Sequence, residues 1–163
     1  MNESKLDVKK RAVIEIAENL FLSQGLATTE MKEIARCASI SRSTLYRMFD
    51  SRETLAFAVA DKCLHELFDP KPMEIYGTDR SGFEILRSYS SNLIETMIQG
   101  VRYVKYLSEF DQMFSGDYPD TPEARKYVQF NRQRHDRQIL LNILRLGTED
   151  GSIRGDIDAN MLE

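Results

Sequence analysis

The chain has 163 residues, of which 42% are hydrophobic and 29% charged, a composition typical of soluble globular proteins. No apolar run reaches the roughly 18 residues that a membrane-spanning helix needs, and the first residues lack a secretory signal, so we expect a cytoplasmic protein with no membrane partner. Cys37 and Cys63 lack metal-ligand spacing, which predicts no metal site and favours two buried, reduced thiols over a redox switch.

The net charge of −4 argues on its own against a nucleic-acid-binding protein, but the charges are unevenly distributed. Residues 1–52 contain nine Lys and Arg against seven Asp and Glu, whereas residues 53–163 contain 13 against 19. The first third of the chain is therefore basic and the remainder acidic, so any attraction for phosphate is limited to one part of the molecule.

All predicted elements are helices, because apolar residues recur every three or four positions and no stretch alternates as a strand does. The first helix is expected over about residues 6–23, and Gly25 follows its end in a left-handed conformation. A second, short helix begins after Thr28 and Thr29, whose hydroxyls suit the N-cap, and ends near Ala38.

A third helix is expected from an N-cap at Ser41 to about Met48. The fourth begins at a capping box formed by Asp50 and Glu53 and ends near Phe68. Its buried side is predicted to consist of the apolar residues spaced by a helical turn, which are Leu55, Val59, Cys63 and Leu67.

Prolines at 70 and 72 open a linker that continues to about Arg80. The apolar stripe from Phe83 to Val101 predicts the next helix, and a break at Gly100 separates it from a further helix that ends near Phe114. A single long helix is then expected, capped by Thr121 and ending near Gly147, before a loop over 151–158.

The two short helices near residues 30–49 have the spacing of a helix-turn-helix motif. Such a corner presents the first turn of its second helix to the DNA major groove, where arginines and hydroxyls contact guanine edges and phosphates. Arg42, Thr44 and Arg47 lie on the outward side of the segment that begins at Ser41, and Leu45 lies on the inward side. By itself, this pattern is equally compatible with an ordinary solvated helix.

The wider pattern closely resembles the N-terminal domain of TetR-family regulators over about residues 7–67. The resemblance rests on more than twenty positions at fixed spacing. They are Ile14, Ile16, Ala17, Leu20, Phe21, Gly25, Thr29, Ile34, Ala35, Ala38, Ile40, Ser41, Ser43, Thr44, Leu45, Tyr46, Phe49, Ser51, Arg52, Glu53 and Leu55.

The resemblance implies an all-α homodimer in which a three-helix head is linked by a fourth helix to a larger helical ligand-binding and dimerisation domain, here residues 80–163. It also implies that an unidentified small-molecule inducer releases the protein from a palindromic DNA operator. The usual outcome in the family is repression, with activation as the less common one, and we expect no cofactor. The positions that match DNA-contacting positions of the family are Thr29, Lys32, Ser41, Arg42, Ser43, Thr44, Tyr46, Arg47 and Arg52.

Two of these positions depart from the family pattern, and both departures concern the operator sequence more than DNA binding itself. Ser43 stands where the family often has Gly, and Arg52 where Lys is usual. The loop from Gly151 to Asp158 resembles the one that precedes the last two helices of the family, so we expect the chain to be truncated before the usual dimerisation helices, with dimerisation through other surfaces as the alternative.

The inducer site is expected in the C-terminal half. Tyr103, Tyr106 and Phe110 are candidates to line it, although an aromatic stripe at helical spacing is more often core. If the apolar stripe of the long helix is extended, Asn131 and His135 fall on its inner face and are candidates to contact the ligand. The alternative is that the helix is exposed to solvent at this point.

Two other classes of protein are set against this interpretation. An enzyme is disfavoured, because the chain has two histidines, no nucleophile elbow, no phosphate-binding Gly-rich loop and no metal spacing. A helical adaptor that keeps the head but binds protein is the alternative, and the outward Arg42, Thr44 and Arg47 count against it.

Overall fold

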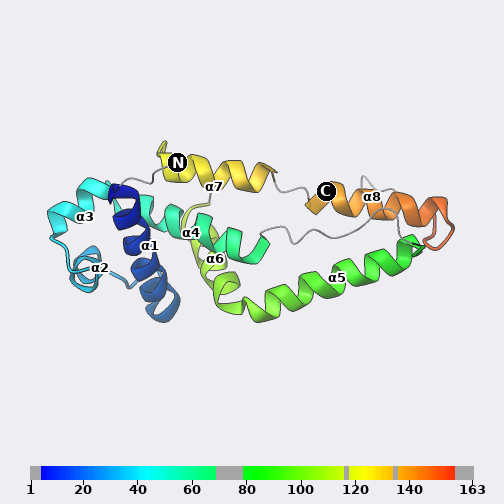
Figure 1. Cartoon of the computed structure of the whole chain (residues 1–163), viewed down its shortest axis with the longest axis horizontal. Coiled ribbons are helices and arrows are strands. Elements are labelled where there is room, and N and C mark those ends of the chain that lie inside the picture. The colour runs from blue at the N-terminus through cyan, green and yellow to red at the C-terminus, as the bar shows by residue number, and fades with distance from the viewer. Residues whose placement is uncertain (1–4, 69–78, 116–117, 134–135, 157–163) are drawn as a thin grey trace. The chain divides into compact units, whose positions relative to one another are not determined.

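The computed structural model describes residues 5–68, 79–115, 118–133 and 136–156 (Figure 1). Within these ranges every regular element is a helix, so the predicted all-α class is confirmed. The helices are α1 (Lys5–Gln24), α2 (Met31–Cys37), α3 (Arg42–Met48), α4 (Arg52–Phe68), α5 (Gly82–Gln99), α6 (Val101–Met113), α7 (Pro122–Gln133) and α8 (Asp136–Glu149).

The contacts divide the chain into two compact units. Unit 1 combines residues 1–68 with residues 100–132, and unit 2 combines residues 69–99 with residues 133–163. The helix-turn-helix segment therefore shares a unit with α6 and α7. The predicted division into a DNA-binding domain over 7–67 and a ligand-binding and dimerisation domain over 80–163 stays a prediction.

Unit 1 has a single aromatic and aliphatic core. Its largest fully buried side chains come from four different segments of the sequence and include Phe21, Phe49, Phe57 and Phe110. The Phe57 and Phe110 rings meet edge to face with their centroids 4.8 Å apart, which is a favourable aromatic geometry and fixes α4 against α6.

The helix ends in unit 1 follow the sequence with two corrections. Gly25 has φ +94° and ends α1 as expected. The N-cap of α2 is Glu30, with no side-chain cap, because the Thr29 hydroxyl is engaged in the interior. The cap of α4 is Ser51 and not Asp50: the Ser51 Oγ accepts a hydrogen bond from the Thr54 backbone N–H at 3.1 Å.

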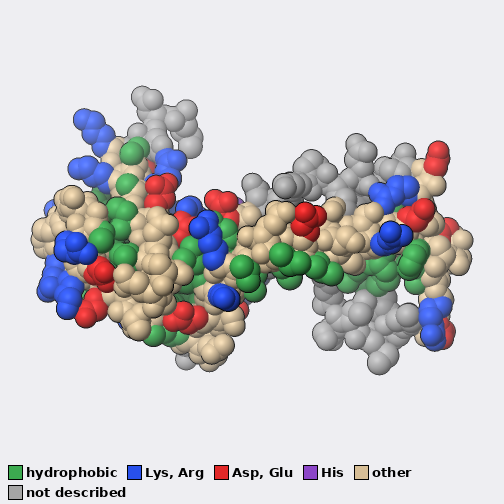
Figure 2. All heavy atoms as spheres, turned by 90° about the horizontal axis from the view of Figure 1, so that it is seen from below, with side chains coloured by type: hydrophobic (Ala, Val, Ile, Leu, Met, Phe, Trp, Pro, Cys, Tyr) green, Lys and Arg blue, Asp and Glu red, His purple; other side chains and the backbone are tan. Residues whose placement is uncertain are grey.

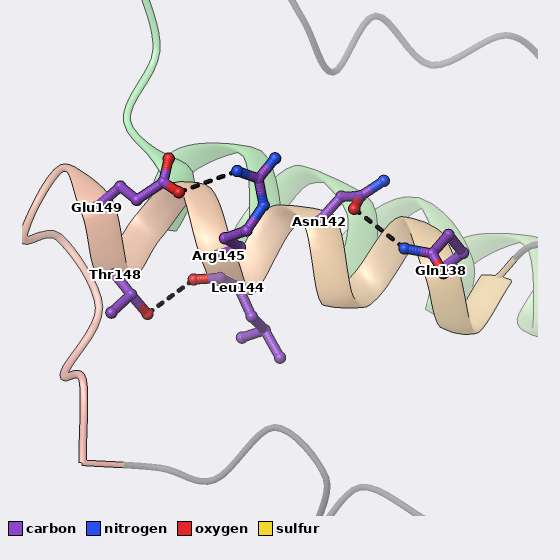
Figure 3. Close-up of polar contacts among 6 residues, drawn as sticks. All are labelled: Gln138, Asn142, Leu144, Arg145, Thr148 and Glu149. Carbon is purple, nitrogen blue, oxygen red and sulfur yellow. Dashed lines mark hydrogen bonds and ion pairs between the residues drawn. The ribbon is translucent and has the colours of Figure 1, made fainter.

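Unit 2 is built on the pairing of α5 with α8 around Ile85 and Ile143. The two helices cross at glycines, and a Cβ atom on Gly82 would lie 2.2 Å from the Cα of Gly147. The loop after α8 caps α5, since the Gly82 N–H donates to Asp150 Oδ2 at 2.7 Å. On the outer surface of α8, hydrogen bonds join residues one turn apart, such as Arg145 to Glu149 at 2.9 Å (Figure 3).

One expectation for this part of the chain is wrong and another is confirmed. The single helix over 121–147 is replaced by α7 and α8, which belong to different units. The helix predicted from the stripe that begins at Phe83 is present as α5. Phe83 and Met97 of this stripe are exposed while Ile85 forms the core face, and Figure 2 shows hydrophobic side chains in a row along α5. Asp158 lies outside the described residues.

Candidate nucleic-acid interface

The first turn of α3 is held by hydroxyl groups. Ser41 is the N-cap, as predicted, and its Oγ accepts from the Thr44 N–H at 3.1 Å. The same oxygen lies 2.9 Å from Ser43 Oγ and 2.8 Å from Thr44 Oγ1. These short contacts fix the turn and use the one donor and two acceptor positions of the Ser41 hydroxyl, whereas the Ser43 and Thr44 hydroxyls keep further hydrogen-bonding capacity.

The inner side of α3 is anchored in the core of unit 1. Leu45 is fully buried, and Met48 and the C-cap Phe49 are buried beside it. The Ile40 N–H donates to the Ala35 carbonyl at 3.0 Å across the turn, where Ser39 has φ +53°. The α2–α3 corner is therefore a fixed geometry that determines which residues point outward.

The outer side of α3 carries Arg42, Tyr46 and Arg47, all exposed. Within the described part of the chain, none of these three side chains takes part in a hydrogen bond or an ion pair, so their polar ends are available to another molecule. Lys32 on α2 is also exposed and is paired with Glu30 at 2.7 Å. Figure 2 shows Lys and Arg side chains gathered over the α2 and α3 end of unit 1.

Two of the predicted contact residues have other roles in the structure. Thr29 is fully buried and its hydroxyl donates to the Gly25 carbonyl at 2.8 Å, so its side chain is not on the surface and the expectation of a side-chain contact is corrected. Arg52 is half-exposed, and its Nη1 donates to the Ala27 carbonyl at 3.3 Å.

The predicted inducer residues do not gather into one site among the described residues. Tyr106 and Phe110 are buried in the core of unit 1 with Tyr103 packed against it, and the Tyr106 hydroxyl donates to the Ala56 carbonyl at 2.9 Å. Asn131 is exposed, which agrees with the second of the two alternatives given for this position and not with an inner-face position. His135 lies outside the described residues.

Burial perturbs several groups behind the interface. Desolvation raises the pKa of Tyr106 well above its usual value and the pKa of Cys63 to about 12, which keeps both groups neutral. Lys62 of α4 pairs with the buried Glu18 of α1. Sequence reasoning missed this pair, although Glu18 lies one turn after Ile14 on the apolar stripe of α1, which was the available signal.

The capped α3, its anchored inner face and its exposed basic outer face are the features of a helix-turn-helix motif of the kind that binds DNA. Residues 13–59 match the sequence model of "Bacterial regulatory proteins, tetR family". The resemblance to TetR-family regulators is therefore confirmed for residues 13–59, which form the DNA-binding domain of this family, and the relatives that the chain matches are transcriptional regulators and not enzymes.

The relatives agree with this assignment. The HTH-type transcriptional repressor KstR2 of Rhodococcus jostii strain RHA1 is 28% identical over 94% of this chain and 72% of its own length. An HTH-type transcriptional regulator of Mycobacterium tuberculosis strain H37Rv is 50% identical over 46 residues, which are 28% of this chain and 23% of that protein.

Among solved structures, the TetR-family regulator PfmR of Thermus thermophilus superposes with a TM-score of 0.65 at 22% identity. The match covers 91% of this chain and 76% of PfmR, so the two proteins share a fold. No helix in the described part of the chain is long and apolar enough to cross a membrane.

Proposed function

We propose that this protein is a cytoplasmic repressor that binds a palindromic operator as a homodimer and leaves it when a small molecule binds. The observation that carries the proposal is the outer face of α3, where Arg42, Tyr46 and Arg47 are exposed and have no partner within the described residues. Arginines that are not paired within the protein cost little to transfer to DNA, because no internal ion pair is lost.

The roles of the side chains follow from their chemistry. Arg42 and Arg47 suit guanine O6 and N7 or phosphate oxygens, and the Tyr46 hydroxyl suits a phosphate. The hydroxyls of Ser43 and Thr44 suit the phosphate beside the first turn of α3, whose shape the Ser41 hydroxyl holds, and Lys32 of α2 suits a neighbouring phosphate once it leaves Glu30.

The proposals of dimerisation and of release by an inducer rest on the family and not on a site among the described residues. Two heads related by twofold symmetry require a palindromic operator whose half-sites are spaced by about one helical turn. An inducer lowers DNA affinity because it binds more tightly to a conformer in which the spacing of the two DNA-binding heads does not match the operator half-sites. Repression is favoured over activation because the relatives that match over 94–97% of this chain are named repressors.

Arg47→Ala tests the surface. Genomic fragments or a random duplex library are first used to find a bound sequence, and binding is then compared by gel shift. The variant should lose about 1–3 kcal/mol of binding free energy per head, because the lost contact is one bidentate arginine. Arg87→Ala is the matched control, since it removes the same charge from an exposed position on α5.

Two results decide between the regulator and the adaptor that binds protein. Salt-sensitive binding to one duplex that weakens in Arg47→Ala and not in Arg87→Ala supports the regulator. No binding to any duplex at low salt, or an equal effect of both variants, contradicts it.

A further inference from the structure

The peptide groups of Ala27, in the segment that joins α1 to α2, are held from both sides by side chains distant in sequence. Its N–H donates to Glu109 Oε1 of α6 at 3.0 Å. Its carbonyl accepts from Arg52 Nη1, in the first turn of α4, at 3.3 Å. We call these two bonds the Ala27 clamp. Both involve a charged side chain, which makes them stronger than bonds between neutral groups.

The rest of the segment around the clamp is held by its own hydroxyls. Thr28 Oγ1 donates to the Gln24 carbonyl at 2.6 Å, and Thr29 Oγ1 donates to the Gly25 carbonyl at 2.8 Å. The Glu109 carboxylate also lies against Gly25, where a Cβ atom would be 3.6 Å from Oε1. Local bonds therefore set the shape of the segment, and the clamp joins it to α4 and α6.

We infer that Glu109 and Arg52 are positioning residues for the helix-turn-helix, and that Arg52 acts through the clamp and not as a phosphate contact. The inference rests on the DNA binding proposed above. The segment 25–30 is the covalent lead into α2, and α2 forms a fixed corner with α3. If α6 shifts and the hydrogen bond from the Ala27 N–H to Glu109 breaks, residues 25–30 are no longer held against α6. The outer face of α3 then loses its fixed orientation.

The salt dependence of DNA binding separates positioning from phosphate contact. A duplex selected from a random library by the unaltered chain is the probe. Arg52→Met should weaken binding about threefold to tenfold, the range of one net hydrogen bond, with the slope of log K against log salt unchanged. Arg47→Ala serves as the reference for a contact, where the slope should fall by about one per phosphate lost. A slope that falls by the same amount in Arg52→Met overturns the inference for Arg52.

Substitution of Glu109 gives a second test, because simple electrostatics and the positioning role predict opposite changes in DNA affinity. Removing a carboxylate from a DNA-binding protein should strengthen binding, as expected for Glu15→Ala, the control at an exposed position on α1. Glu109→Ala should instead weaken binding about threefold to tenfold and speed hydrogen exchange at the Ala27 amide by a similar factor. Glu109→Gln should restore both, because its amide oxygen can still accept the N–H.

Binding by Glu109→Ala that equals or exceeds that of the unaltered chain, or exchange at Ala27 that does not change, overturns the inference and leaves the proposed function intact. Failure of the unaltered chain to bind any duplex overturns the proposed function itself, and the inference with it.

Discussion

At the scale of single residues, burial of ionisable groups behind the interface makes stability depend on alkaline pH. Burial raises the pKa of the Cys63 thiol from 9.0 to about 12. Below pH 9 the thiol is protonated in both the folded and the unfolded chain, so its contribution is fully present. Above pH 9 only the unfolded chain loses the proton, so stability falls as pH rises toward the folded pKa.

Cys63→Ala should therefore flatten the alkaline end of the stability profile. One pH unit above the unfolded pKa, the buried thiol costs about 1.4 kcal/mol of unfolding free energy, and the variant should not show this loss. Urea unfolding at pH 8 and pH 10 gives the comparison. The variant is expected to be less stable at pH 8 because of the cavity, so the test is the change with pH and not the absolute value. Equal pH dependence in both proteins would contradict the assignment.

Burial of single residues was predicted correctly where apolar residues recur at helical spacing. It was predicted wrongly where a polar side chain hydrogen-bonds to another part of the fold. Leu45 and Cys63 were placed correctly because their neighbours one turn away are apolar. Thr29 was expected on the surface, yet its hydroxyl bonds to Gly25 inside. Cys37 was expected to be buried but is exposed as the last residue of α2, a position that the period of so short a helix does not determine.

At the scale of elements, the crossing of α5 and α8 depends on two glycines. A Cβ atom on Gly82 would meet the backbone of Gly147 at 2.2 Å, and a backbone cannot move aside as a flexible side chain can. The space between the helices is therefore closed to any side chain at this position, and an added methyl group must push them apart.

Gly82→Ala should destabilise the α5–α8 pair by about 1–3 kcal/mol or more. Hydrogen exchange should become faster at amides of α5 and α8 and stay unchanged in α1 to α4, because unit 1 has a separate core. Gly155→Ala is the matched control, since a Cβ atom there meets only the Thr148 methyl group at 3.2 Å. Equal exchange in both variants would show that the crossing is not tight.

The sequence predicted where the helices lie better than it predicted where they end and which other helices they pack against. The α3 cap was found because Ser41 precedes a short apolar pattern, whereas Asp50 and Ser51 are both good caps and the sequence does not decide between them. The division into α7 and α8 was missed because the residues from 131 to 138 continue a helical pattern without Gly or Pro. Which helix α6 packs against depends on long-range contacts such as that of Phe57 with Phe110, which no local pattern reveals.

At the scale of the whole molecule, the charge is divided so that an acidic protein can bind DNA. Residues 1–52 carry more basic than acidic groups although the net charge is −4. Attraction to phosphate is local and falls off within about 10 Å at 0.1 M salt, so the acidic remainder does not prevent binding by the head. It does repel DNA at longer range, and this should keep non-specific binding weak.

The number of heads that bind together can be read from the salt dependence of binding. One head offers Lys32, Arg42 and Arg47 as exposed cations on the proposed surface. If each neutralises one phosphate, log K should fall with log salt with a slope of about −3 for one head and about −5 for a dimer on a palindrome. Fluorescence anisotropy on a half-site duplex and on the full palindrome measures both values.

A steeper slope on the palindrome, lost when one half-site is scrambled, is the expected result, because each half-site then engages one head. Arg47→Ala should lower the slope by about two on the palindrome and by about one on the half-site, since the dimer loses the residue twice. Equal slopes on both duplexes would mean that one head binds at a time, and the homodimer would then be wrong even though α3 still binds DNA.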